Sequence, residues 1–165
     1  MKVIFLDIDG VLYPCFSRRT SCFHAEAVRS RLQKEGISTE GITDWDLCSV
    51  VCGFQIAAVE RLRRLCEQSG AKIVLETSWK CMRNLDEMKR LFSLWRLDSY
   101  IVEMTDNEEM FFKEGAIQRY LDARIRQWKT TSFWMISPCG RHFPDMMWLR
   151  RTSLMKKVID RRFIY

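Results

Sequence analysis

Short apolar runs alternate along the chain with longer segments in which apolar residues recur every three to four positions. The runs are KVIFL (2–6), AKIVLET (71–77), SYIVEM (99–104) and SFWMIS (132–137). Continuous apolar runs of this length are typical of strands that are buried on both faces of a parallel sheet. The pattern therefore predicts four strands.

The segments between these runs predict helices. HAEAVRSRLQKEG (24–36) and the segment 56–70 each end at a glycine, which commonly terminates a helix. Two more helices are predicted over 85–92 and from about 114 to 129, whereas 37–53 has no clear period and is expected to be a loop or small insertion. Strands that alternate with helices indicate βαβ units, and hence a mostly parallel sheet covered on both faces.

Length and composition exclude several classes of protein. With 165 residues, 47% of them hydrophobic, and no linker rich in Pro, Gly or Ser, the chain is expected to fold as one domain over 1–165. No apolar run approaches the roughly 20 residues of a membrane-spanning helix. The seven Cys are an odd number without a CxxC pair, which argues against a disulfide framework and favours reduced thiols in a cytoplasmic protein.

Positive charge is concentrated in the C-terminal segment. The net charge is +6, and residues 150–165 carry six Lys or Arg against one Asp. One interpretation is a contact surface for nucleic acid or another polyanion. The other is a solvated terminal helix, and the sequence does not decide between them.

Two acids follow the first predicted strand directly. Asp7, Asp9 and Gly10 lie at its carboxyl end, where ligands bind in open α/β sheets. Two carboxylates one residue apart repel each other, so the pKa of at least one is expected to be raised unless a metal ion or a basic side chain compensates the charge. An Asp-Gly turn with solvated carboxylates is the alternative.

The segment VIFLDIDGVL (3–12) resembles the first motif of the haloacid dehalogenase (HAD) phosphohydrolases, an apolar strand followed by Asp, any residue, Asp, Gly and an apolar pair. In that family the first acid is the nucleophile and the second is the general acid/base. The resemblance therefore places these roles on Asp7 and Asp9, which would also bind the magnesium ion.

Two further segments are similar to later motifs of the same family. GAKIVLETSWK (70–80) resembles the second motif, in which a hydroxyl donates a hydrogen bond to a phosphoryl oxygen; the match is Thr77, with Ser78 as the alternative. Lys113, at the start of the fourth predicted helix, matches the lysine that neutralises the phosphoryl group and the nucleophile. The resemblance implies that these side chains converge with the acid pair at one end of the sheet.

The fourth motif of the family is not matched. In the family the fourth core strand ends in one or two acids that complete the magnesium site, whereas this chain has Ser137, Pro138 and Cys139. Hard cations bind none of these side chains well. Asp145, several residues downstream, is the candidate substitute, and weak magnesium binding is expected.

The resemblance covers the chain from Lys2 to about Arg151. It implies an α/β fold, a three-layer Rossmann-like HAD core with a mostly parallel sheet and a short flap and insertion at 13–53 in place of a large cap. The implied activity is magnesium-dependent hydrolysis of a phosphate monoester through an aspartyl-phosphate.

Two other functions stay open. A HAD-like domain with weakened catalysis would serve as a binding or regulatory module, contacting nucleic acid through the basic segment 150–165. Alternatively, the substrate is a phosphorylated nucleic-acid end instead of a phosphorylated small molecule, an interpretation that only the charge supports. The sequence names neither the substrate nor the oligomeric state, because specificity in such folds lies in insertions and rim residues.

Overall fold

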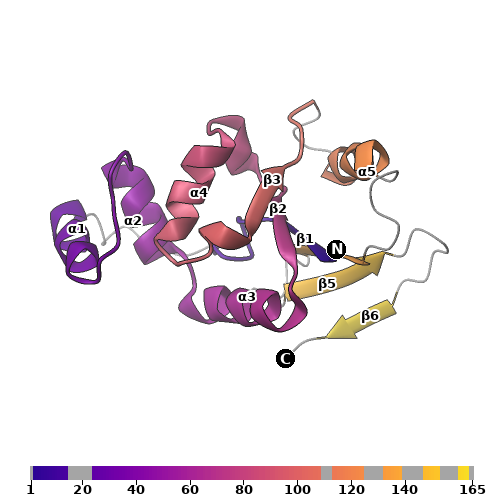
Figure 1. Cartoon of the computed structure of the whole chain (residues 1–165), viewed down its shortest axis with the longest axis horizontal. Coiled ribbons are helices and arrows are strands. Elements are labelled where there is room, and N and C mark those ends of the chain that lie inside the picture. The colour runs from indigo at the N-terminus through magenta and orange to yellow at the C-terminus, as the bar shows by residue number, and fades with distance from the viewer. Residues whose placement is uncertain are drawn as a thin grey trace.

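The fold is an α/β arrangement of one sheet with helices on both sides (Figure 1). The computed structural model describes residues 2–14, 24–108, 113–124, 132–138, 147–152 and 160–163, the last three ranges by their backbone alone. In chain order the elements, with η for short 3₁₀ helices, are β1 (Lys2–Leu6), α1 (Ala25–Lys34), α2 (Asp44–Gly53), α3 (Ile56–Ser69), β2 (Lys72–Leu75), η1 (Ser78–Cys81), α4 (Leu85–Ser93), η2 (Asp98–Tyr100), β3 (Ile101–Met104), α5 (Lys113–Arg124), β4 (Ser132–Pro138), β5 (Met147–Thr152) and β6 (Asp160–Phe163).

The sheet has the strand order β3-β2-β1-β4-β5-β6. The first four strands in this order are parallel to one another, and β5 and β6 continue the sheet as antiparallel strands. Leu6 at the end of β1 pairs with Leu75 of β2 and with Ile136 of β4. The mostly parallel sheet and the Rossmann-like α/β core expected from the sequence are therefore confirmed.

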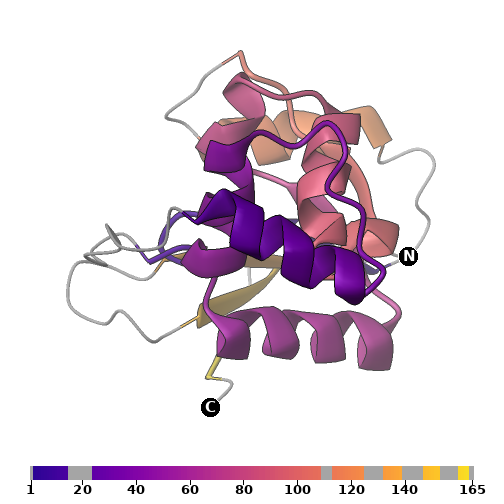
Figure 2. The ribbon, with the colours of Figure 1, turned by 90° about the vertical axis from the view of Figure 1, so that its left-hand side faces the viewer.

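β1 divides its side chains between two apolar clusters. Val3 and Phe5 pack with residues of α5 on one face of the sheet, whereas Ile4 and Leu6 join the larger cluster with α1 to α4 on the other face. All four are almost completely buried, as expected of a continuous apolar run in a strand covered on both faces. Figure 2, which looks at the molecule from the side of α1 and α2, shows both helices in front of the sheet.

The segment 37–53 was expected to be a loop or a small insertion, and it contains a helix, so the loop alternative is wrong. α2 begins after Thr43, whose hydroxyl accepts a hydrogen bond from the N–H of Asp46 at 3.1 Å, a common N-cap arrangement. Leu47 and Val50 of α2 are buried in the larger cluster. The apolar residues of this helix, DWDLCSVVCG, are spread around its circumference and do not form one stripe. The period that marks an amphipathic helix is therefore absent.

The C-terminal segment forms strands in its described part, so the terminal helix considered for 150–165 is wrong there. β5 pairs with β4, and β6 pairs with β5. The cause is tertiary, because the backbone groups at the open edge of β4 provide hydrogen-bond partners for β5. A local pattern of side chains does not reveal such an edge.

The ends of two helices agree with the glycines in the sequence. α3 ends at Gly70, with φ of 67°, and Gly36 follows α1 with φ of 72°. These left-handed conformations favour glycine, which has no Cβ to clash. α5 is described as far as Arg124, and the rest of the helix predicted to about 129 lies outside the described residues.

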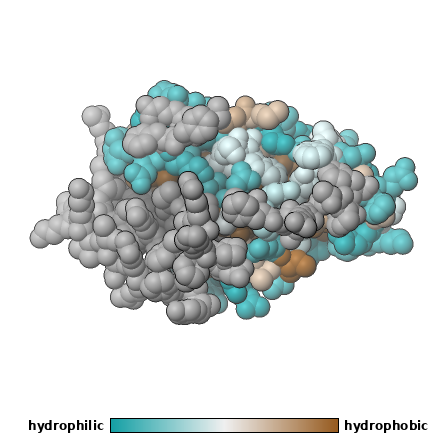
Figure 3. All heavy atoms as spheres, turned by 180° about the vertical axis from the view of Figure 1, so that it is seen from behind, coloured by the Kyte–Doolittle hydropathy of each residue, from teal (hydrophilic) through white to brown (hydrophobic). Residues whose placement is uncertain are grey.

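The described surface is mostly polar on the face shown in Figure 3, where apolar residues form only small patches. Among the described helices, none is long and apolar enough to cross a membrane. The apolar residues of the described part therefore serve mainly the two clusters around the sheet.

Candidate active site

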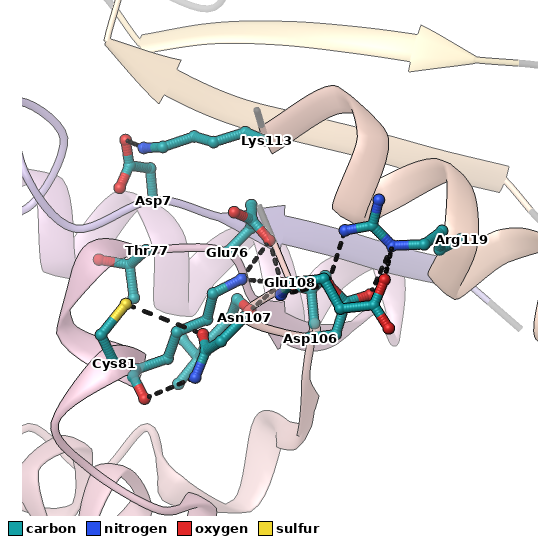
Figure 4. Close-up of polar contacts among 12 residues, drawn as sticks. Asp7, Glu76, Thr77, Cys81, Asp106, Asn107, Glu108, Lys113 and Arg119 are labelled. Atoms are coloured by element: carbon teal, nitrogen blue, oxygen red, sulfur yellow. Dashed lines mark hydrogen bonds and ion pairs between the residues drawn. The ribbon is translucent and has the colours of Figure 1, made fainter. Parts of the chain in front are cut away.

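Asp7 lies at the carboxyl end of β1 and is contacted by a lysine 106 positions later in the chain. Its carboxylate Oδ2 accepts a hydrogen bond from the Nζ of Lys113, the first residue of α5 (Figure 4). Its Oδ1 accepts a second from the backbone N–H of Ile8 at 2.9 Å. The Asp7 side chain is 3% exposed and that of Lys113 is 33% exposed. The structure therefore brings together the first acid and the lysine that the sequence singled out.

Burial raises the pKa of the Asp7 carboxyl above its ordinary value of 3.8. The hydrogen bond and charge of Lys113 and the N–H of Ile8 oppose this shift, and the charge of Asp9 adds to it as the smallest contribution. The sequence predicts a raised pKa from repulsion between the two acids, whereas the main cause is the removal of Asp7 from water. The ion pair with Lys113 is thus an important compensation for a carboxylate in a buried position.

The second acid has a different set of partners. Asp9 Oδ2 accepts a hydrogen bond from the hydroxyl of Ser78 at 3.0 Å, and Oδ1 accepts one from Trp79 Nε1 at 3.1 Å. Both oxygens are therefore oriented by consecutive residues of η1, the SW pair that follows the second strand. No role for Trp79 was predicted from the sequence.

Trp79 is fixed by aromatic and cationic neighbours. Its ring lies 6.0 Å from that of Tyr13 and 6.1 Å from that of Phe54, measured between centroids. The guanidinium of Arg83 lies over the ring at 5.3 Å, and Arg83 also forms an ion pair with Asp46 of α2. The insertion between β1 and α3 thus supports the residue that orients the second acid.

Thr77, the candidate phosphate ligand, lies at the same edge of the sheet as the acid pair. The parallel strands β1 and β2 are paired as far as Leu6 and Leu75, and Thr77 follows the end of β2 as Asp7 follows the end of β1. Its side chain is buried and caps η1, accepting a hydrogen bond from the N–H of Trp79 at 3.4 Å. In the structure Thr77 therefore acts as an N-cap, and the alternative hydroxyl, that of Ser78, is the one that contacts Asp9.

A buried ion pair lies next to this edge and was missed by the sequence analysis. Lys80 Nζ donates a hydrogen bond to Glu76 Oε2 at 2.8 Å, and the side chains are 4% and 5% exposed. The hydroxyl of Thr105, after β3, contacts both groups. The spacing of four residues between Glu76 and Lys80 was the available signal, but only burial distinguishes this pair from a solvated one.

The end of the fourth strand lies beside Asp7. Leu6 pairs with Ile136, so Ser137 is level with Asp7, and Pro138 is the last residue of β4. Of the other two residues considered for the fourth motif, Cys139 and Asp145 lie outside the described residues.

A complete cation site is absent from the described part of the chain, where no three or more His, Cys, Asp or Glu residues are grouped to hold a metal ion. Magnesium often binds through one or two carboxylates, with water and substrate phosphate supplying the other oxygens. The buried carboxylate of Asp7, with Asp9 two residues away, fits a site of that kind. It does not fit a site made of protein ligands alone.

Comparison with known proteins gives one family. A family model described as the HAD domain in Swiss Army Knife RNA repair proteins matches residues 3–161. No curated protein and no solved structure matches the chain. The matched range contains both acids, Thr77, Lys113 and most of the basic C-terminal segment.

Proposed function

The chain belongs to the family of HAD domains in Swiss Army Knife RNA repair proteins, and we propose that it hydrolyses phosphate monoesters at the ends of RNA. The observation that carries the proposal is the contact between the buried carboxylate of Asp7 and Lys113 at the carboxyl edge of the sheet. A carboxylate nucleophile must be ionised to attack. A cation beside it favours that ionised form and also attracts the negatively charged phosphoryl group.

Two displacement steps account for the reaction. In the first, an oxygen of Asp7 attacks phosphorus, the bond from phosphorus to the RNA oxygen breaks, and Asp9 gives its proton to that oxygen. In the second, Asp9 takes a proton from a water molecule whose oxygen attacks phosphorus. The bond between Asp7 and phosphorus then breaks and inorganic phosphate leaves. Lys113 stabilises the charge on the transferred group in both steps.

Magnesium is the cofactor that suits these residues, and the carboxylate of Asp7 and the backbone carbonyl of Asp9 would hold it. When bound, it supplies positive charge against the phosphoryl oxygens. Few ligands come from the described residues, so substrate oxygens and water would supply the others. Weak binding is therefore expected in the absence of substrate.

RNA as the substrate is supported by the family description and by charge. The net charge is +6, and the basic C-terminal segment lies partly in β5 and β6, where Arg150 is opposite Arg161. Positive charge of this kind attracts the phosphate backbone of nucleic acid over a distance. Cys66 and Cys81 are free thiols, which is consistent with a cytoplasmic location.

The proposal is tested by measuring phosphate release with magnesium from an aryl phosphate and from short RNA carrying a 5′- or a 3′-phosphate. Release that disappears in the Asp7→Asn protein is the expected result. The competing function is a binding module with a weakened site, which the unmatched fourth motif favours. RNA binding without phosphate release from any of the three substrates would establish that function instead.

Trp79→Phe is expected to slow the hydrolysis of phosphate esters with poor leaving groups more than that of esters with good leaving groups. The substitution keeps an aromatic ring but removes the N–H that orients Asp9, and only a poor leaving group needs a well-placed acid. A roughly tenfold loss is expected for an alkyl phosphate, with a smaller loss for p-nitrophenyl phosphate. Single-turnover rates for the two substrates measure the difference. An equal loss for both would show that Trp79 has only a structural role.

Ser137→Asp is expected to tighten magnesium binding, because Ser137 is level with Asp7 on the neighbouring strand and a new carboxylate there adds an anionic ligand. A gain of roughly ten- to a hundredfold in affinity is expected, measured by calorimetric titration. Ser132→Asp, at the opposite end of β4 beside Lys2, is the matched control. If neither Ser137→Asp nor Pro138→Asp binds magnesium more tightly than this control, the fourth motif does not lie at this strand end.

A further inference from the structure

A separate pocket lies among α1, α2, α3 and the end of α4. Its volume is about 260 Å³, and its lining combines four aliphatic side chains with Trp95, three arginines (Arg31, Arg63 and Arg96) and Glu35. Trp95 and Arg96 precede β3 in the chain and therefore lie towards its amino end, whereas Asp7 follows the carboxyl end of the parallel strand β1. The pocket is thus not part of the candidate active site.

Positive charge exceeds negative charge in this pocket. Three arginines and one glutamate line it, and Arg31 Nε lies 3.9 Å from Glu35 Oε1. Arg63 donates from Nη2 to the carbonyl of Trp95 at 3.0 Å, but its Nε is buried without a hydrogen-bond partner among the described residues. A buried donor is costly to leave unsatisfied, so the charge of Arg63 is only partly compensated among the described residues.

Arg96 has an unfavourable backbone conformation for its residue type. It follows α4 with φ of 55°. The N–H of Arg96 donates to the carbonyl of Ser93 at 2.9 Å, and the N–H of Leu97 donates to the carbonyl of Phe92 at 3.1 Å. This is the Schellman ending of a helix, in which the left-handed residue is usually glycine. An arginine here costs conformational free energy. Strained residues of this kind occur at binding sites, and the Arg96 side chain lines the pocket.

We propose that this pocket binds a phosphate group of a nucleic-acid strand. Guanidinium groups match phosphate oxygens with paired hydrogen bonds, and three arginines line this pocket. The apolar wall suits the attached nucleoside, and the indole of Trp95 is fixed by its bond from Nε1 to the carbonyl of Val50 at 3.1 Å. The volume is below the usual ligand-pocket range of about 300 to 1,000 Å³, so the pocket would take only a small part of a strand. The identification of the strand as RNA rests on the proposed function. The expectation that the pocket binds a phosphate group does not, because it comes from the arginines.

Two tryptophan indoles allow both sites to be followed in one experiment. The N–H of Trp95 reports on the pocket, and the N–H of Trp79 reports on Asp9 at the candidate active site. The ¹⁵N-labelled full chain is titrated with inorganic phosphate, with AMP and with a short RNA that has hydroxyl groups at both ends. A saturable shift of the Trp95 signal with AMP and with RNA is expected. No shift with either would overturn the proposal, and a shift with inorganic phosphate alone would assign the pocket to free phosphate and overturn the strand assignment.

Three variants separate binding from folding. Arg63→Gln and Arg96→Gly are each expected to raise the Kd for AMP, measured from the Trp95 signal, by roughly tenfold. This factor corresponds to the loss of one charge-assisted contact. Arg96→Gly also places glycine where the backbone favours it, so its thermal midpoint should be equal to or above that of the unmodified protein. Arg64→Gln, exposed on α3 and absent from the pocket lining, is the matched control.

The inference is wrong if both pocket variants bind AMP as tightly as Arg64→Gln. It fails separately from the proposed function, because the Trp95 response does not require turnover. Absent phosphatase activity with an intact Trp95 response would contradict the proposed function alone.

Discussion

Replacing Asp7 by Asn is expected to abolish phosphate release while leaving the protein at least as stable as before. Loss of a carboxylate nucleophile removes the covalent route, so a decrease on the order of a thousandfold or more is expected. Stability is expected to hold because burial disfavours the charged form of Asp7, which is why its pKa is raised. Lys113 is 33% exposed, so water solvates its ammonium when the partner charge is gone.

The stability difference should depend on pH in a defined direction. A carboxyl whose pKa is raised on folding binds its proton more tightly in the folded than in the unfolded protein. We therefore compare the unmodified protein with the Asp7→Asn protein. The relative stability of the unmodified protein falls as pH rises from the ordinary pKa of 3.8 towards the raised pKa of Asp7 in the folded protein. The variant should gain in relative stability over that interval and keep its advantage at neutral pH.

Thermal midpoints between pH 3 and 8, together with phosphate release at neutral pH, measure both effects. Asp122→Asn, on the exposed side of α5, is the matched control and should change neither quantity. If Asp7→Asn retains most of the activity, another group is the nucleophile. A stability loss that grows with pH would show that the ion pair with Lys113 outweighs the cost of burying Asp7.

Replacing Lys80 by Met is expected to cost about 3–5 kcal/mol of unfolding free energy. Methionine retains much of the apolar stem of lysine, so the main change is the loss of charge. Glu76 would then be a buried carboxylate whose remaining described side-chain contact is the hydroxyl of Thr105. Breaking a buried pair in this way is much more costly than removing both charges, because one ion stays desolvated.

Urea unfolding at neutral pH, with two comparison proteins, measures this effect. Combining Glu76→Gln with Lys80→Met removes both charges and should recover most of the lost stability. Arg31→Met breaks the exposed pair with Glu35, which has the same four-residue spacing, and should cost less than about 1 kcal/mol. If Lys80→Met costs no more than Arg31→Met, burial of the pair does not determine its contribution.

The sequence alone determined the strands of the parallel core and the position of the first acids. Buried strands are continuous apolar runs, so KVIFL and its counterparts are visible without tertiary information. Gly36 and Gly70 similarly mark helix ends, because the left-handed conformation is a local property of one residue. Asp7 follows β1 directly, and its position at the carboxyl edge follows from the strand itself.

The partners of the site residues were decided by tertiary structure. The order of motifs suggested that Lys113 belongs with Asp7, but their contact depends on how α5 packs against the sheet. Ser78 and Trp79 contact Asp9, because the turn of η1 sets which side chains point towards it. A string of residues carries no information about such directions until the loop is folded.

Tertiary packing also decided the features that local patterns misjudged. α2 lacks an apolar stripe and is helical because it packs within the larger cluster, and β5 is a strand because β4 offers an open edge. The cause of the raised pKa of Asp7 and the pairing of Lys80 with Glu76 both depend on burial. Periodicity and residue type thus set the local structure and the candidate chemistry. Desolvation and contacts between distant segments determined which of these residues meet, because both exist only in the folded chain.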